Sequence, residues 1–303
     1  MFVVNSLPLA ILFCVVTMLG WGSWANTQKL AGKEKWPFEL FYWDYAIGVF
    51  LFSILFAATL GGGFNIVAAA TIPALISGAI FNLANILLVV AIDAAGMSVA
   101  FPVGIGLALI IGTVESYVEA PKGNPSLLFA GVALIVFAMV MSAAARQSVG
   151  KNRARGLIFS IIAGCIMGLF YPQLMRAIGP GKLSPYVALV FFGLGVLVSN
   201  LLVNTVFMKA GRVSYADYFR GSAKLHFIGI LGGSIWMVAL CLNVIASNVA
   251  GPAISYALGQ GATLIAAIWG VLIWREKGIP SYTALMFIGY LTGLILIGAA
   301  TLH

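Results

Sequence analysis

The sequence contains one long apolar pattern twice, and this duplication constrains the fold more than any other feature. Residues 93–126 align without gaps with residues 248–281, at an offset of 155 residues. The matched pairs are Ala95/Ala250, Gly96/Gly251, Phe101/Tyr256, Gly104/Gly259, Gly106/Gly261, Lys122/Lys277, Gly123/Gly278, Pro125/Pro280 and Ser126/Ser281. In each copy a very short turn leads into an apolar span, which ends at a Lys-Gly-x-Pro-Ser turn. A repeat that falls on apolar spans predicts a membrane fold made by duplication.

The low charge content excludes a water-soluble globular protein. Only 8% of the 303 residues are charged and 62% are hydrophobic, whereas soluble domains carry about 25% charged residues. The net charge of +8 comes from basic residues scattered among the loops, so no nucleic-acid partner is predicted. Most of the surface of this chain must therefore face the lipid bilayer and not water.

Specialised chemical motifs are missing from the sequence. Cys14, Cys165 and Cys241 lie far apart inside apolar spans, which favours packing in helix interfaces over a disulfide or metal site. The sequence has no phosphate-binding loop, no paired metal-ligand spacing and no nucleophile elbow. We therefore expect no metal, no cofactor and no enzymatic activity.

Ten stretches are long and apolar enough to cross a membrane, which requires about 20 residues in a helix. They cover approximately residues 6–25, 42–60, 67–92, 97–118, 125–145, 156–178, 185–208, 223–246, 251–274 and 280–301. The first reaches spanning length, so it is interpreted as a transmembrane helix and not as a signal peptide. These stretches predict an all-α polytopic membrane protein with ten transmembrane helices.

The distribution of lysine and arginine predicts the orientation of the chain. Thirteen of the sixteen basic residues lie in loops after odd-numbered spans, whereas Lys122, Arg176 and Lys182 follow even-numbered spans. Basic loops face the cytoplasm. Both termini are therefore predicted to lie outside the cytoplasm.

Two halves of five spans each are predicted to be inverted relative to one another. The first half covers residues 1–146, a basic cytoplasmic linker covers 147–155, and the second half covers 156–303. Gly20/Gly168 and Pro37/Pro185 give a second register, offset by 148 residues. Because each half has an odd number of spans, the second enters from the opposite side. Inverted repeats are typical of alternating-access carriers, whose binding site lies between the halves.

Two carboxylates within spans are candidates for proton coupling. Glu115 shares a helical face with Gly104, Ala108 and Gly112, which suits a carboxylate beside a cavity. It could instead reach the outer interface and pair with Lys122. Asp44 opens the second span, where a carboxylate also stabilises a helix N-terminus and the flanking aromatic residues resemble an interfacial belt. We favour this structural interpretation for Asp44.

Amide, hydroxyl and aromatic side chains recur along the inner spans and predict a shared, uncharged cavity. The candidates for its lining are Trp21, Asn82, Asn85, Tyr171, Asn200, Trp236, Asn243, Tyr256, Gln260 and Thr263. For any one of them, hydrogen bonding between helices is the simpler explanation. As a group they suit a neutral polar solute, with aromatic faces that can stack on a sugar or a heterocycle.

Short motifs in collinear order support a family resemblance. They are Asp44-Tyr45, Asn85, Gly96-Met97-Ser98-Val99, Ile110-Ile111-Gly112-Thr113, Leu128-Phe129-Ala130-Gly131-Val132, Ala163-Gly164-Cys165, Leu169-Phe170-Tyr171-Pro172 and Trp269-Gly270-Val271-Leu272. With the ten spans, they make the chain resemble the drug/metabolite transporter superfamily. Within it, the chain is similar to the branch of ureide permeases, glucose/ribose porters and rhamnose–proton symporters. The long central loop of the plant ureide permeases is absent, which suggests a bacterial chain in the inner membrane.

The resemblance implies proton-coupled uptake of a small neutral solute, such as a ureide, a nucleobase or a sugar. We therefore expect a secondary active permease that works by alternating access, with protons as the coupling partner. The alternatives are a drug or metabolite exporter and a non-transporting membrane scaffold or sensor. No oligomeric state is predicted.

Overall fold

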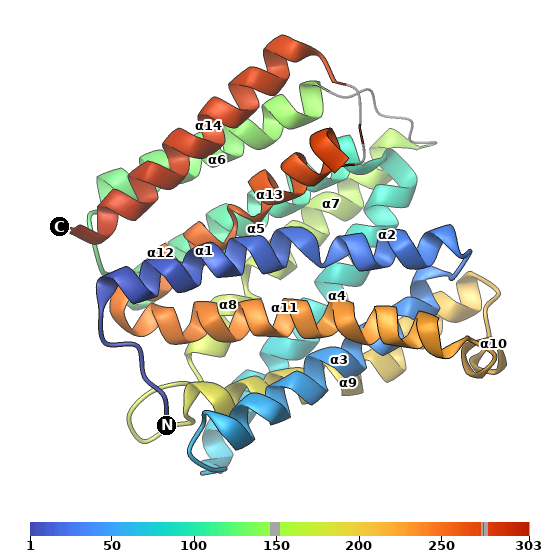
Figure 1. Cartoon of the computed structure of the whole chain (residues 1–303), viewed down its shortest axis with the longest axis horizontal. Coiled ribbons are helices and arrows are strands. Elements are labelled where there is room, and N and C mark those ends of the chain that lie inside the picture. The colour runs from blue at the N-terminus through green and yellow to red at the C-terminus, as the bar shows by residue number, and fades with distance from the viewer. Residues whose placement is uncertain (146–151, 274, 276–277, 303) are drawn as a thin grey trace.

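A computed structural model describes residues 1–145, 152–273, 275 and 278–302, apart from the side chains of residues 93, 97 and 98. Ten helical segments of this part of the chain are long and apolar enough to cross a membrane. They lie roughly along one axis as a bundle (Figure 1). The predicted fold class, all-α with ten spans, is confirmed.

The first six helices form the first five spans. Their bounds are α1 (Leu7–Ser23), α2 (Ala25–Lys33), α3 (Phe38–Thr59), α4 (Ala68–Ala95), α5 (Met97–Glu119) and α6 (Pro125–Ala144). Asn124 caps α6, because its side chain accepts a hydrogen bond from the Leu127 amide.

The remaining helices form the other five spans and one short surface helix, α10. Their bounds are α7 (Arg153–Gly168), α8 (Phe170–Met175), α9 (Pro185–Ala210), α10 (Tyr215–Phe219), α11 (Ala223–Ala250), α12 (Pro252–Gly259), α13 (Ala262–Ile268), a π-helical turn (Trp269–Ile273), α14 (Pro280–Ala299) and a 3₁₀ turn (Ala300–Leu302). Most of the predicted linker, residues 147–151, lies outside the described residues.

Span 1 is longer than the sequence predicts. The apolar stretch ends near residue 25, but after a one-residue turn at Trp24, whose φ and ψ remain in the helical region, α2 continues to Lys33. Thr27 and Ala31 are buried on α2, and Thr27 lies against Gly232 of α11. Packing against α11 therefore extends the helix through residues too polar to be recognised as part of a span. Lys29 and Lys33 consequently belong to a helix and not to a loop.

The two short turns of the repeat have the same backbone geometry. Gly96 joins α4 to α5 with φ 81° and ψ 155°, and Gly251 joins α11 to α12 with φ 89° and ψ 147°. The turns are tighter than predicted, because the preceding helices continue to Ala95 and Ala250. Equal conformations at matched positions are consistent with an internal duplication.

Spans 1, 6 and 9 are interrupted. The breaks fall at Trp24, at Leu169 between α7 and α8, and at Gln260-Gly261 between α12 and α13. α5, which the sequence pairs with span 9, is continuous. Corresponding spans therefore share their turns but not all of their interior breaks.

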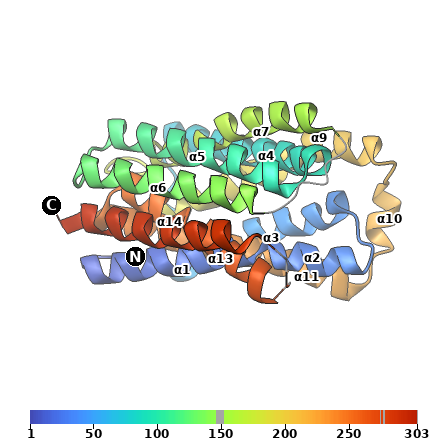
Figure 2. The same cartoon turned by 90° about the horizontal axis from the view of Figure 1, so that it is seen from above.

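Small residues allow neighbouring helices to approach closely, as in other membrane bundles. Gly48 of α3 faces the Ile230 backbone of α11, and Gly233 of α11 faces the Tyr45 backbone of α3. α6 and α14 lie side by side at one edge of the bundle (Figures 1 and 2). Cys14 and Cys241 are buried as expected, but Cys165 is exposed on α7.

Both chain ends lie at one end of the bundle, and α10 lies at the other (Figures 1 and 2). We call these the terminal end and the α10 end. An even number of spans requires this arrangement. The α10 end carries the loops that the basic residues predict to be cytoplasmic.

Candidate functional site

A cluster of aromatic rings at the middle of the bundle gathers around Trp236 of α11. Its ring stacks on Trp21 of α1 at 5.9 Å and on Phe192 of α9 at 5.7 Å between centroids. Phe81 of α4 lies 4.2 Å away and Phe170 of α8 lies 6.4 Å away. All five rings are buried. The cluster contains side chains from helices of both sequence halves, so a displacement of Trp236 would alter its packing against each of these helices.

A tyrosine pair extends this cluster toward α5. The rings of Tyr171 and Tyr256 lie 4.9 Å apart, and Phe170 lies 6.1 Å from Tyr256. The Tyr256 hydroxyl donates a hydrogen bond of 3.3 Å to the Ala108 carbonyl of α5. Tyr256 therefore connects α12 to α5, the two spans that the repeat places in register.

Within the part of the chain that the structure describes, several buried polar groups near these rings have no hydrogen-bond partner. Both amide atoms of Asn82 are unpaired, next to Phe81 on α4, and so is the Trp21 indole nitrogen. Asn243 donates 2.7 Å to the Ser255 carbonyl but leaves its own oxygen unpaired. A buried unsatisfied polar group costs about 1–3 kcal/mol. A hydroxylated ligand among the rings would satisfy these groups.

The other predicted lining residues are distributed more widely. The Thr263 hydroxyl donates 3.0 Å to the Gln260 carbonyl at the break between α12 and α13. Asn85 donates 3.1 Å to the Tyr42 hydroxyl of α3. Asn200 lies eight residues beyond Phe192 on α9, about 12 Å toward the α10 end, with both amide atoms unpaired. Asn85 and Asn200 are thus separate from the central rings.

A cavity of about 710 Å³ lies at the terminal end. Its walls include residues 1–4, Lys122, Met175, Lys182 and Ser247. Met175 lies about one helical turn beyond Tyr171 in the same span. Met175 is therefore a wall residue close to the tyrosine pair, although the tyrosines and the rings of the aromatic cluster do not themselves line the cavity.

Asp44 is buried at the α10 end, with only 1% of its side chain exposed. The Tyr218 hydroxyl of α10 donates 2.6 Å to its Oδ1. The Nδ1 atom of His226, on α11, lies 2.9 Å from Oδ1 and 3.0 Å from Oδ2. Gly229 of α11 provides the space for the carboxylate. Asp44 therefore binds two side chains from the second half of the chain, which a simple helix-terminus role does not require.

His226 lies between Asp44 and the surface. Its side chain is 24% exposed, and its ring packs edge-on against Trp36 and Tyr218. Burial, with the neighbouring Asp44 carboxylate, raises the pKa of Tyr218. Tyr218 consequently remains a hydrogen-bond donor to Asp44.

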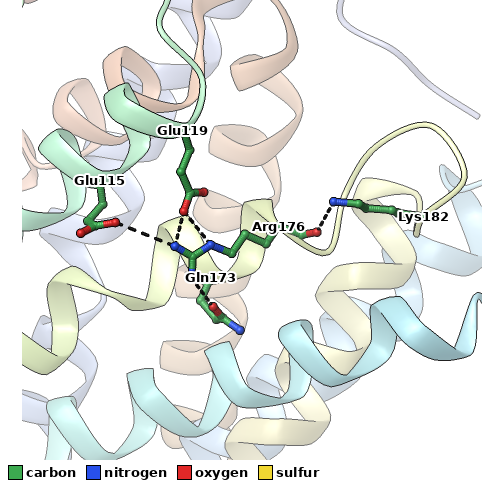
Figure 3. Close-up of polar contacts among 5 residues, drawn as sticks. All are labelled: Glu115, Glu119, Gln173, Arg176 and Lys182. Carbon is green, nitrogen blue, oxygen red and sulfur yellow. Dashed lines mark hydrogen bonds and ion pairs between the residues drawn. The ribbon is translucent and has the colours of Figure 1, made fainter.

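Glu115 lies near the terminal end, in a cluster of charged side chains (Figure 3). Arg176 binds Glu119 through two guanidinium nitrogens and lies 3.8 Å from Glu115. Gln173 accepts 2.9 Å from the same guanidinium. Lys122, the alternative partner suggested by the sequence, donates instead to the Asn248 carbonyl at 3.2 Å. About 44% of the Glu115 side chain is exposed, so it is far less buried than Asp44.

His226 and Tyr218 are not among the residues predicted from the sequence. His226 lies near the end of a span, and Tyr218 lies on α10, between two predicted spans. The sequence did contain a signal for this contact. Asp44 and His226 each lie within two helical turns of the end of a predicted span, and the basic residues place both of these ends on the cytoplasmic side of the membrane. Only the packing of α3 against α11 brings them into contact.

Comparison with known proteins identifies the family. A family model described as Sugar transport protein matches residues 12–303. The chain belongs to this sugar transport family. A solved structure titled "Crystal structure of protein" is similar to the chain, with a TM-score of 0.71, 14% identity and 95% of each chain covered. At that identity the likeness supports the fold alone. Family membership and ten apolar helices together identify a multi-pass membrane protein of a sugar-transporter family.

Proposed function

We propose that this protein takes up a sugar by alternating access, with protons as the coupling ion. Membership of the sugar transport family carries the proposal. The substrate would bind at the central aromatic cluster, and the cavity at the terminal end would lead to it. The membrane would be a bacterial inner membrane, with the α10 end in the cytoplasm.

The chemistry of the cluster suits a sugar. A pyranose presents flat C–H faces that pack on aromatic rings, and its hydroxyls pair with amides. Trp21 and Trp236 supply stacked rings, while Asn82, Asn243 and the Trp21 indole supply unpaired polar atoms. The rings now contact each other, so a sugar would have to separate them. A ureide or a nucleobase would use the same groups, and these solutes belong in the same assay.

The arrangement of the helices supports alternating access. Trp236 contacts rings from α1, α4, α8 and α9, and Tyr256 bonds α5. Opening the cluster would therefore displace helices of both predicted repeats against each other. The breaks at Trp24, Leu169 and Gln260-Gly261 are positions where a span could bend.

A proton could couple to transport through one of two carboxylates, Glu115 or Asp44. Each lies within a span, and each contacts a residue of the second half of the chain. Protonation of either would alter a contact between the halves. This is the requirement for an ion that drives a conformational change.

The test is solute flux into proteoliposomes that contain the purified full-length chain. We expect a proton gradient to drive the accumulation of a monosaccharide, tested beside a ureide, a nucleobase and a typical efflux drug. Trp236→Leu should lower affinity for the accepted solute at least tenfold. The matched control is Trp43→Leu, since Trp43 bonds Met208 at the α10 end, away from the cluster. Drug efflux without sugar uptake, or equal effects of the two substitutions, would contradict the proposal.

A further inference from the structure

Among the residues that the structure describes, the contact between Asp44 and His226 differs from the other charged contacts because its carboxylate is buried. Moving a carboxylate out of water costs several kcal/mol unless a partner compensates for it. Glu115 has a partner of permanent charge, since arginine keeps its proton in proteins. Histidine can be neutral or cationic near neutral pH. The Asp44–His226 contact can therefore hold either one proton or two, whereas the Glu115–Arg176 contact includes a charge that does not change.

We propose that Asp44 and His226 bind the coupling proton and that His226 passes it between Asp44 and the aqueous phase at the α10 end. This inference rests on the proposed proton-coupled function and assigns it to one site. A proton that reaches the imidazole from water makes it cationic. Transfer of the Nδ1 proton to an Asp44 oxygen then leaves a neutral imidazole and a carboxylic acid. The contact gains one proton in total, and release follows the reverse path.

The surroundings supply the contacts that such a site needs. The groups that act on the Asp44 carboxylate are Tyr218 from α10 and His226 from α11. The nearby surface charges form ion pairs with one another. The Lys224 Nζ atom lies 2.8 Å from a Glu34 carboxylate oxygen, and an Arg220 guanidinium nitrogen lies 3.9 Å from an Asp217 carboxylate oxygen. On α3 itself, the Glu39 carboxylate lies against Gly211. α10 covers the carboxylate, so proton access runs past the part-exposed imidazole.

The residues beside Asp44 on α3 contact the interior of the bundle. Tyr42 and Tyr45 flank Asp44 on α3, with their rings stacked at 5.2 Å. Tyr42 accepts a hydrogen bond from Asn85 of α4, and Tyr45 packs on Trp24 at the break in span 1. A shift of α3 relative to α11 on protonation would therefore move residues on α4 and at the break. Protonation at Asp44 would in this way be mechanically linked to the helices around the proposed substrate site.

The experiment separates solute exchange from proton coupling in proteoliposomes, using the sugar that the wild type accumulates. Counterflow at equal pH measures exchange, and accumulation under an imposed proton gradient measures coupling. We expect Asp44→Asn to retain counterflow and to lose accumulation above equilibrium. His226→Gln removes the imidazole that carries the proton to Asp44, so the pH profile of counterflow should shift away from the wild-type profile. Glu34→Gln, an exposed substitution on the same face, should change neither measurement.

Each outcome decides between specific alternatives. If the wild type shows no gradient-driven accumulation, the proposed coupling fails and this inference fails with it. If both the wild type and Asp44→Asn accumulate sugar, the proposed proton-driven transport is supported but Asp44 and His226 are not the coupling site. If Asp44→Asn does not fold, the His226→Gln profile decides. An unshifted profile overturns the inference, because a purely structural contact would alter expression or melting without moving the pH dependence.

Discussion

Gly96 and Gly251 lie 155 residues apart in the sequence and adopt nearly the same left-handed backbone conformation, each between two consecutive spans. Their ψ values place both in a region of backbone space that only glycine occupies readily. A Cβ at Gly251 would also lie 2.9 Å from the Lys122 Cβ. The tight turns of both repeats thus depend on glycine.

Alanine at either turn should destabilise the protein by about 1–3 kcal/mol, the usual cost of such a strained residue. Thermal unfolding in detergent should show lower melting temperatures for Gly96→Ala and Gly251→Ala. Gly32→Ala in α2 is the control, because a Cβ there meets no atom within 4 Å. Equal melting of all three variants would contradict the assigned role of the turns.

Replacing Asn82 by leucine should separate stability from substrate binding. Its buried amide has no partner among the described residues, so an apolar side chain of similar size removes an unsatisfied group and should leave the melting temperature unchanged or raised. If the amide binds sugar, affinity should fall at least tenfold, or about 1.4 kcal/mol. The measurement is a binding isotherm beside a melting curve. Unchanged affinity would exclude Asn82 from the binding site.

The attachment of α10 should depend on its capping box. The Ser214 hydroxyl accepts from the Asp217 amide, and Asp217 accepts from the Ser214 amide. Ser214→Ala should weaken this short helix by about 0.5–2 kcal/mol. Hydrogen exchange should then speed up at residues 215–219. Exchange at the Gly251 turn, which lies against Lys122 at the terminal end of the bundle, serves as the internal reference.

The same helix should loosen in acid. Hydrogen bonds from the Ser214 hydroxyl and amide lower the pKa of Asp217. A lowered folded-state pKa means that this stabilisation is complete above the ordinary aspartate value and is lost as the pH falls through the folded value. The hydrogen-exchange protection factors of α10, which correct for the slower intrinsic exchange in acid, should therefore fall at acidic pH, and less so in Ser214→Ala. An equal loss of protection in both would assign the effect to another group.

Glu115→Gln should retain proton-driven accumulation if Asp44 is the coupling group. Arg176 would still bind Glu119, and half-exposed ion pairs contribute only about 0–1 kcal/mol, so melting should change little. Uptake under a proton gradient is the measurement. Loss of accumulation with intact counterflow would indicate that Glu115, and not Asp44, is the coupling group.

Features that depend on local sequence could be predicted, whereas features that depend on contacts between residues far apart in the sequence could not. Hydropathy located the ten spans because each must be apolar along its own length. The continuation of span 1 through α2 was missed, because Thr27 and Ala31 are buried by α11, about 200 residues away in the sequence. The repeat located the turns at Gly96 and Gly251, since a required glycine leaves a local signal.

The candidate site was harder to predict because its contacts are not local. Trp21, Trp236, Tyr171 and Tyr256 were selected as lining residues, and the structure brings them into one aromatic group. Asn85 and Asn200 shared the same helical stripes but lie nearer the α10 end. Asp44 was interpreted as a helix-terminus residue, because its contact with His226 arises only when α3 packs on α11.

The exposure of Cys165 makes the natural chain suitable for spectroscopy. Cys14 and Cys241 are buried, whereas Cys165 is exposed on the lipid-facing side of span 6, so an apolar, membrane-permeant fluorophore or spin label should attach selectively to α7. The adjacent Gly164 packs against the Gly104 backbone of α5. A reporter at Cys165 would therefore register relative movement of these two helices during a transport cycle, without any cysteine having to be introduced.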